Sequence, residues 1–148
     1  MVVFKIHYRD RILTFVARLM ASAQLGGLEE FEGTVEKVEF EIGAEERRQY
    51  HIYIIAADIE VTGPTGRMHE WVPMSPKATE ESVPNGSVAD RYLTQMEICV
   101  PAIKRTKTLK EAFQLLVGRK FRFQRIKLGR DFEGHPAREY IVPVARLD

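Results

Sequence analysis

The sequence predicts a mixed fold, mainly β with a smaller helical part, formed as one domain over residues 1–148. Apolar residues recur at strand length in five stretches, at 31–42, 50–61, 67–74, 119–125 and 140–144. Helical spacing is found between the third and fourth of these stretches. The content of 45% hydrophobic and 29% charged residues is that of an ordinary globular domain.

The first stretch changes phase along its length. Phe31 and Val35 belong to one alternation, whereas Val38 and Phe40 belong to the other. Such a flip is typical of a β-bulge, which we expect near Glu36. Stretch 50–61 is almost continuously apolar and predicts a central strand, so that stretch 67–74 completes a three-stranded meander.

Two helices are expected between the third and fourth strands. Ser87 is a suitable N-cap for a helix with Val88, Tyr92 and Met96 on one side. For the second helix, Thr108 and Glu111 form a capping box, and Gly118 stands where a left-handed C-terminal residue is favoured.

Residues 1–27 predict an extension, with a strand at 2–8 and an amphipathic helix that starts near Asp10 and ends at Gly26. We expect this helix to pack within its own chain, since helices of this kind usually face their own core. The alternative is a homo-oligomer formed through the same helix. The barrel-like remainder would span 28–148.

Charge is strongly segregated although the formal net charge is only +1. Residues 28–46 contain eight glutamates against the single base Lys37, and residues 104–130 contain ten bases against the single acid Glu111. This distribution predicts a dipolar molecule with one basic side.

Cys99 is the only cysteine, which excludes an internal disulfide and fits a reducing, cytoplasmic environment. Charged residues interrupt the N-terminal apolar run, so neither a signal peptide nor a membrane span is expected.

The most basic part of the chain alternates cations with rings. Phe121 and Phe123 lie two residues apart and share one face of the expected strand, where they are either core residues or stacking platforms. The predicted contacts to nucleic-acid phosphates are the cations around them: Arg119, Lys120, Arg122, Arg125, Lys127 and Arg130.

The order of elements resembles the OB-fold, a five-stranded Greek-key β-barrel with a helix between strands three and four. The chain is most similar to single-stranded DNA-binding domains of the replication protein A type, through residues 31–35, 50–58, 115–118 and 120–123. It departs from them in the N-terminal helix and in a helical insertion at 75–106.

The resemblance implies that strands two and three form the binding face. That face would contain Tyr53, Arg67, His69 and Trp71, with Trp71 as the main stacking residue. The alternative for Tyr53 and Trp71 is core packing, because tryptophan is highly buried on average and the neighbours of Tyr53 are apolar.

No catalytic or metal motif accompanies these residues. The four histidines are widely separated, no phosphate-cradling glycine loop occurs, and no nucleophile elbow is found. We therefore expect no enzyme activity, no metal and no cofactor. The predicted function is non-catalytic binding of single-stranded nucleic acid, with DNA favoured over RNA. The alternatives are a protein–protein or self-assembly module with complementary acidic and basic faces, and a small-ligand barrel closed by loop 75–86.

Overall fold

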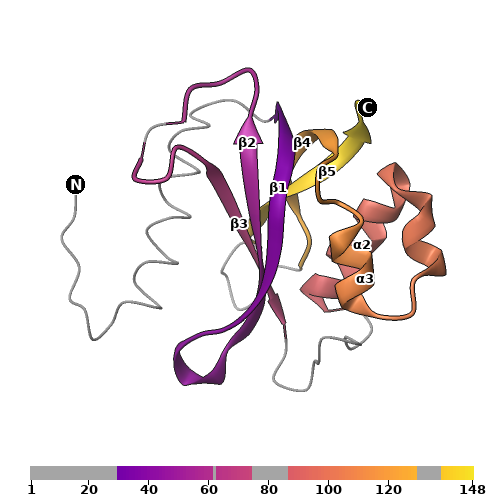
Figure 1. Ribbon diagram of the computed structural model, residues 1–148. Coiled ribbons are helices and arrows are strands. Elements are labelled where there is room, and N and C mark those ends of the chain that lie inside the picture. The colour runs from indigo at the N-terminus through magenta and orange to yellow at the C-terminus, as the bar shows by residue number, and fades with distance from the viewer. Residues whose placement is uncertain (1–29, 62, 75–86, 130–137) are drawn as a thin grey trace.

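The computed structural model describes residues 30–61, 63–74, 87–129 and 138–148. Five strands form one antiparallel sheet in the order β3-β2-β1-β4-β5, and helices α2 and α3 pack beside it (Figure 1). The strands are β1 (Glu30–Ile42), β2 (Arg48–Ala56), β3 (Met68–Met74), β4 (Lys120–Lys127) and β5 (Glu139–Arg146). The helices are α2 (Val88–Cys99) and α3 (Leu109–Gln114), with short 3₁₀-helices η2 (Ala44–Glu46) and η3 (Pro101–Arg105).

The expected bulge in β1 is confirmed. The pairing with β2 shifts between Val35 and Lys37, so that Glu36 is the extra residue on the longer strand. A Cβ atom at Gly33 would lie 2.7 Å from Cγ2 of Ile54, so only glycine allows β2 this close. β1 therefore pairs with β2 over most of its length and with β4 over its first residues.

Both predicted helix starts are confirmed, with one difference. The hydroxyl of Ser87 accepts from the Asp90 backbone N–H at 3.1 Å, and that of Thr108 accepts from the Glu111 N–H at 3.1 Å. The Glu111 carboxylate, however, accepts from the N–H of Lys107 at 3.0 Å rather than completing the capping box on Thr108.

The predicted helix before β4 is shorter than expected. Its α-helical part ends at Gln114, and the chain continues through tighter turns, with Val117 N–H donating to Gln114 O at 3.2 Å. Gly118 adopts a φ of +81°, and its N–H donates to Val35 O at 2.8 Å. The expected strand 50–61 also ends early, at Ala56.

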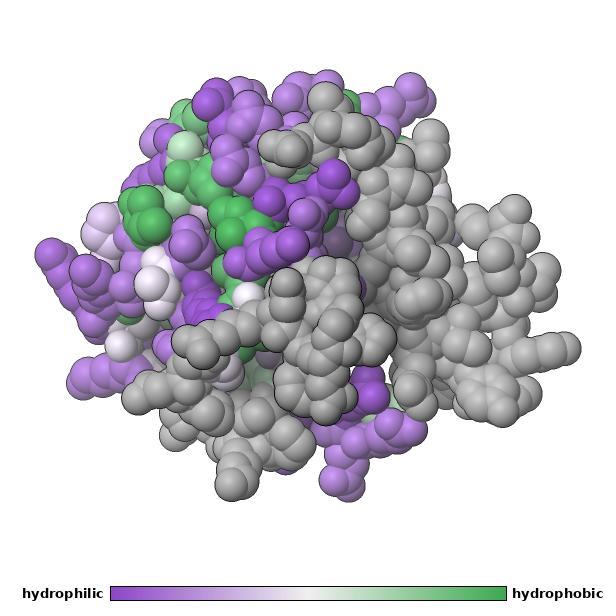
Figure 2. Space-filling view, turned by 180° about the vertical axis from the view of Figure 1, so that it is seen from behind, coloured by the Kyte–Doolittle hydropathy of each residue, from purple (hydrophilic) through white to green (hydrophobic). Residues whose placement is uncertain are grey.

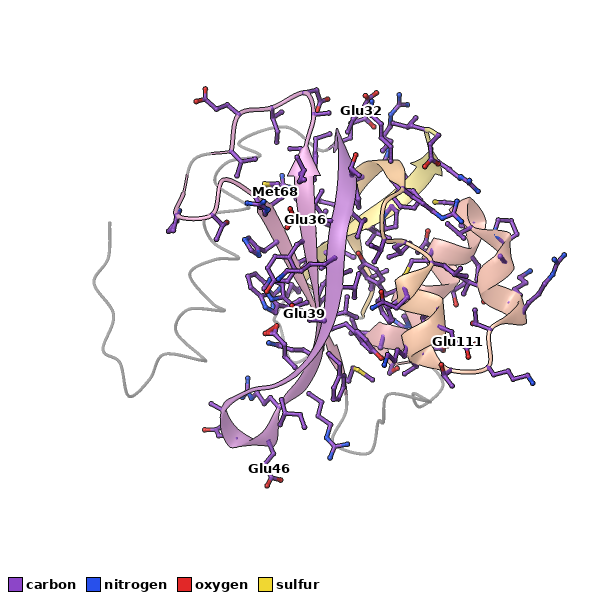
Figure 3. All side chains as sticks on the ribbon, in the orientation of Figure 1. Glu32, Glu36, Glu39, Glu46, Met68 and Glu111 are labelled. Atoms are coloured by element: carbon purple, nitrogen blue, oxygen red, sulfur yellow. The ribbon has the colours of Figure 1, made fainter. Side chains whose placement is uncertain are left out.

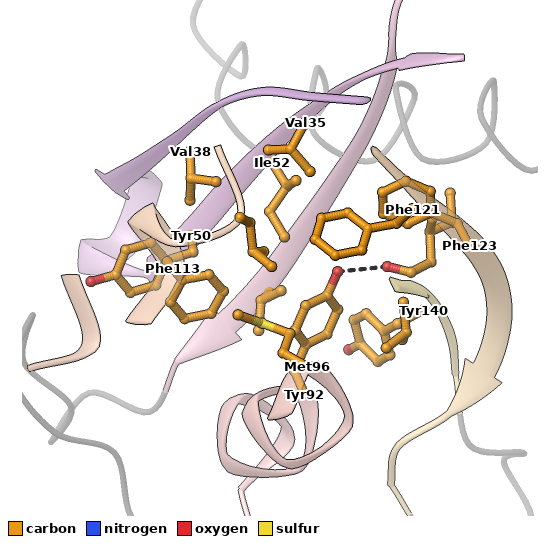
Figure 4. Packing of buried hydrophobic residues seen from close by; sticks show 14 of the residues in the cluster. Val35, Val38, Tyr50, Ile52, Tyr92, Met96, Phe113, Phe121, Phe123 and Tyr140 are labelled. Atoms are coloured by element: carbon orange, nitrogen blue, oxygen red, sulfur yellow. Dashed lines mark hydrogen bonds between the residues drawn. The ribbon is translucent and has the colours of Figure 1, made fainter. Parts of the chain in front are cut away.

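The core lies between the sheet and the two α-helices (Figure 4). The largest fully buried side chains are Tyr50, Tyr92, Phe113, Phe121 and Phe123. Tyr50 stacks on Phe113 with ring centroids 4.1 Å apart, which joins β2 to α3. On the face seen from behind, hydrophobic residues form a narrow strip bordered by hydrophilic ones (Figure 2).

The two outer strands, β3 and β5, are joined by a buried glutamate. In the described part of the chain no backbone ladder connects them. Instead the carboxyl group of Glu70 accepts from the N–H of Ile141 at 2.8 Å and from that of Trp71 at 2.7 Å. The Tyr92 hydroxyl donates to Ile141 O at 2.7 Å, as the dashed line in Figure 4 marks. Ile141 thus has both of its backbone groups bonded to side chains.

Burial raises the pKa of the Glu70 carboxyl to about 8, and the two backbone N–H donors oppose this rise.

Some predictions concern residues outside the described ones: the N-terminal strand and helix, the homo-oligomer through that helix, loop 75–86 and Arg130.

Candidate functional site

Four rings lie together on the outer face of β2 and β3. His51 is paired with Trp71, and Tyr53 with His69, in the antiparallel ladder. Because side chains alternate along a strand, all four point to the same side. The ring centroids of His51 lie 3.8 Å from Tyr53 and 4.4 Å from Trp71, and those of His69 and Trp71 lie 5.5 Å apart. We call these four residues the ring row.

The two histidines of the ring row share a hydrogen bond. His51 Nε2 lies 2.7 Å from His69 Nδ1, and His69 Nε2 lies 2.8 Å from the hydroxyl of Thr65. On the other side, Glu41 Oε1 lies 2.7 Å from His51 Nδ1. Burial and the neighbouring His51 lower the pKa of His69 to about 4, so His69 is uncharged at neutral pH.

Tyr53 is held from two sides by charged residues of β1. Its hydroxyl donates to the Glu39 carboxylate at 3.2 Å, and Nζ of Lys37 lies 4.3 Å from its ring centroid. Burial, followed by the charge of Glu39, raises the pKa of Tyr53 well above its ordinary value. Lys37 and Glu39 also form a 3.0 Å ion pair with each other.

Arg67, predicted as part of the binding face on strands two and three, is paired with an acid of β1. Its Nε lies 2.8 Å and 2.9 Å from the two carboxylate oxygens of Glu36, and its Nη2 lies 2.8 Å from Glu36 Oε2. The Arg67 hydrogen bond lowers the pKa of Glu36. Glu36 and Glu39 are both labelled along β1 in Figure 3. The ring row is therefore bordered by acids that already have partners.

Three of the predicted cations of β4, Lys120, Arg122 and Arg125, have partners in the same sheet, whereas Lys127 has none among the described residues. Arg122 is paired directly with Glu32 of β1 in the ladder, and its Nη2 lies 3.7 Å from the Glu32 carboxylate. Nζ of Lys120 lies 3.9 Å from the same carboxylate, and Nε of Arg125 lies 3.6 Å from Glu139. The acidic and basic segments of the sequence are thus neighbouring strands that compensate each other within one molecule.

The other predicted site residues are placed as follows. Phe121 and Phe123 are fully buried, so they are core residues and not exposed stacking platforms. Trp71 is only 5% exposed, so its ring is covered, whereas Tyr53 and His69 are partly exposed. Arg119 donates from Nε to Leu115 O at 2.6 Å. Of the predicted set, Tyr53, His69 and Trp71 come together with Arg67, while the β4 cations lie across β1 from them.

Sequence reasoning missed two contributors. His51 was not selected, because its proximity to His69 depends on the register between β2 and β3. Glu70 stands in the inward alternation of Met68 and Val72, which was the only signal available for its burial. Within the described ranges, no three His, Cys, Asp or Glu side chains are grouped to hold a metal ion. None of the described helices has the length and hydropathy needed to cross a membrane.

The chain matches no protein-family model, and no curated protein is significantly similar to it in sequence.

Proposed function

We propose that this protein is a non-catalytic, OB-fold-type module that binds single-stranded nucleic acid, with DNA favoured over RNA. The observation that carries the proposal is the ring row on the outer face of β2 and β3. In OB-folds the face of the second and third strands receives oligonucleotides. A row of aromatic faces suits bases of any sequence, since every base has a π-face.

The strand order supports an OB-type barrel. An OB-fold is a five-stranded, partly open Greek-key barrel, in which the sheet curls until its outer strands approach each other. Here β3 and β5 are the two outer strands of a sheet with that order, and the helices come between β3 and β4. The Glu70 carboxylate connects β3 to β5 at the position where closure is needed. We infer a Greek-key barrel closed partly by side chains.

The accessible part of the ring row is Tyr53 with His69, because Trp71 is covered. The ring of Trp71 stacks on the imidazole of His51, with ring centroids 4.4 Å apart, rather than on a base. A base placed on Tyr53 would take the position of the Lys37 ammonium, which lies over the ring.

The test is fluorescence anisotropy with a labelled oligonucleotide, titrated in single- and double-stranded form. Tyr53→Ala is expected to weaken single-strand binding about 5- to 150-fold, which corresponds to the loss of one stacked base. Ile98→Ala is the control, because Ile98 is 67% exposed on α2, and α2 packs on the side of the sheet opposite to the ring row. Equal binding of both nucleic-acid forms, or equal effects of the two variants, would contradict the proposal.

The alternative of self-assembly through complementary faces has less support. It requires the acidic strand of one copy to meet the basic strand of another. The two strands concerned, β1 and β4, already pair with each other in one chain.

A further inference from the structure

The cations without partners are concentrated in one short segment. Among the described residues, most lysines and arginines have an ion pair, a hydrogen bond or a ring contact. The exposed lysines and arginines that have none within this part of the chain are Lys104, Arg105, Lys107, Lys110 and Lys127. Four of these five lie between residues 104 and 110, which we call the basic segment.

The fold presents the basic segment on a fixed backbone. Ile103 and Leu109, on either side of it, are 5% and 6% exposed and belong to the core. Thr106 folds back on η3, with its hydroxyl donating to Ile103 O at 2.6 Å and its N–H to the same oxygen at 3.1 Å. The backbone of the segment is therefore anchored, while its four charged side chains have no partner among the described residues, so little backbone entropy is lost on binding.

The acid nearest in sequence does not neutralise this segment. The Glu111 carboxylate forms no ion pair with these cations among the described residues, and it accepts instead from the backbone N–H of Lys107 at 3.0 Å. By contrast, Lys120, Arg122 and Arg125 of β4 have carboxylates within 3.9 Å. A polyanion that approaches the molecule gains most from the cations that have no acid to give up, because no existing ion pair is lost.

We propose that the basic segment is a second binding surface, which holds the phosphate backbone of the same strand whose bases stack on the ring row. This inference rests on the proposed function. The ring row needs such a partner surface, because Arg67 and Lys37 beside it are paired with Glu36 and Glu39. The helices lie on one side of the sheet (Figure 1), and by the alternation along β2 and β3 the ring row lies on the other. A strand that contacts both must therefore pass around the sheet and exceed a short OB site of about 4–16 nucleotides.

The experiment compares oligo-dT of about 8 and about 30 nucleotides, titrated by anisotropy across a salt series. The variant replaces all four cations of the basic segment with glutamine, and thermal unfolding verifies that it folds like the wild type. A smaller variant, Lys107→Gln/Lys110→Gln, is matched in charge by Lys120→Gln/Arg122→Gln on β4.

For the longer oligonucleotide, loss of four phosphate contacts is expected to lower the slope of log K against log salt by about 3. Affinity at about 0.1 M salt should then fall on the order of a hundredfold or more. Binding of the short oligonucleotide should stay within about threefold of the wild type, because it occupies the ring row alone. The β4 control should change binding of either oligonucleotide far less than the matched pair in the basic segment.

Three results would overturn the inference. If the wild type binds and the four-fold variant keeps its salt slope, the basic segment is not a phosphate surface while the proposed function stands. If the wild type binds neither oligonucleotide, the proposed function fails and the inference with it. If poly-glutamate binds more tightly than oligo-dT and depends on the same four residues, the surface belongs to an acidic protein partner instead.

Discussion

Two boundaries in the sheet are each bridged by a glutamate, and the two glutamates do different things. Between β1 and β4, Glu32 lies beside Lys120 and Arg122, on top of a regular backbone ladder. Between β3 and β5 the described chain has no ladder, and Glu70 itself accepts the N–H groups of both strands. Glu32 adds ion pairs to two strands that backbone hydrogen bonds already join. Glu70 supplies hydrogen bonds between two strands that have no backbone ladder in the described chain.

The difference lies in the surroundings rather than in the residue type. Glu32 is partly exposed, so water screens its ion pairs and limits their contribution to stability. Glu70 is buried, and any donor that it releases stays without a partner in the core. A glutamate therefore changes the surface charge at the β1–β4 boundary, whereas a glutamate at the β3–β5 boundary holds two strands together.

Glu70→Ala is expected to have the largest effect on stability. It leaves the N–H groups of Trp71 and Ile141 without an acceptor, and each such group costs about 1–3 kcal/mol. The free energy of unfolding should fall by about 2–5 kcal/mol, measured by urea denaturation. Tyr92→Phe is the control, since it removes a single hydrogen bond from the carbonyl of Ile141 and should cost less. A loss below about 1 kcal/mol for Glu70→Ala would mean that other groups replace it.

The pH dependence of stability is the second way to test the comparison. Folding raises the pKa of Glu70 from an ordinary 4.5 to about 8, so the folded protein keeps a proton that the unfolded chain releases. Its contribution is complete below about pH 4.5 and is lost as the pH rises to about 8, with a slope of at most about 1.4 kcal/mol per pH unit. Glu70→Gln has nothing to titrate there, so the difference between wild type and variant, measured by denaturation from pH 5 to 9, should show this slope. A constant difference would contradict the expectation.

The fold followed from the sequence where the signal was local. The phase flip between Val35 and Val38 predicted the bulge, and the hydroxyls of Ser87 and Thr108 predicted two helix starts. These features depend on neighbours along the chain. The ending of β2 at Ala56 did not follow, because the N–H of Glu32 on β1 donates to the side chain of Asp58 at 2.9 Å instead of continuing the backbone ladder.

The candidate site followed only in part, because its charges and rings meet across strands. The net charges of the acidic and basic segments were evident, but the register that sets Glu32 opposite Arg122 was not. Ion pairs between β1 and β4 neutralise charges that a count along the sequence would have assigned to binding a nucleic acid. Likewise, the sequence left Trp71 open between base stacking and core packing, because its burial depends on tertiary packing that no alternation pattern reveals.

Glu32→Gln should have the smallest effect on stability and yet test the argument about compensated charge. The loss of two partly exposed ion pairs, at 3.7 Å and 3.9 Å, should change the free energy of unfolding by less than about 0.5 kcal/mol. The same change frees Lys120 and Arg122, so oligo-dT should bind more tightly, with a salt slope steeper by about 0.7–1.4.

Glu139→Gln is the graded control for this last change, since it frees the single cation Arg125. Its effect on oligo-dT binding should be about half as large, because one cation is released instead of two. If Glu32→Gln leaves the affinity unchanged, the cations of β4 are too far from the strand to matter, whether or not they are paired. In that case β4 and the basic segment differ in oligonucleotide binding because of their positions in the fold, and not because β1 neutralises the cations of β4.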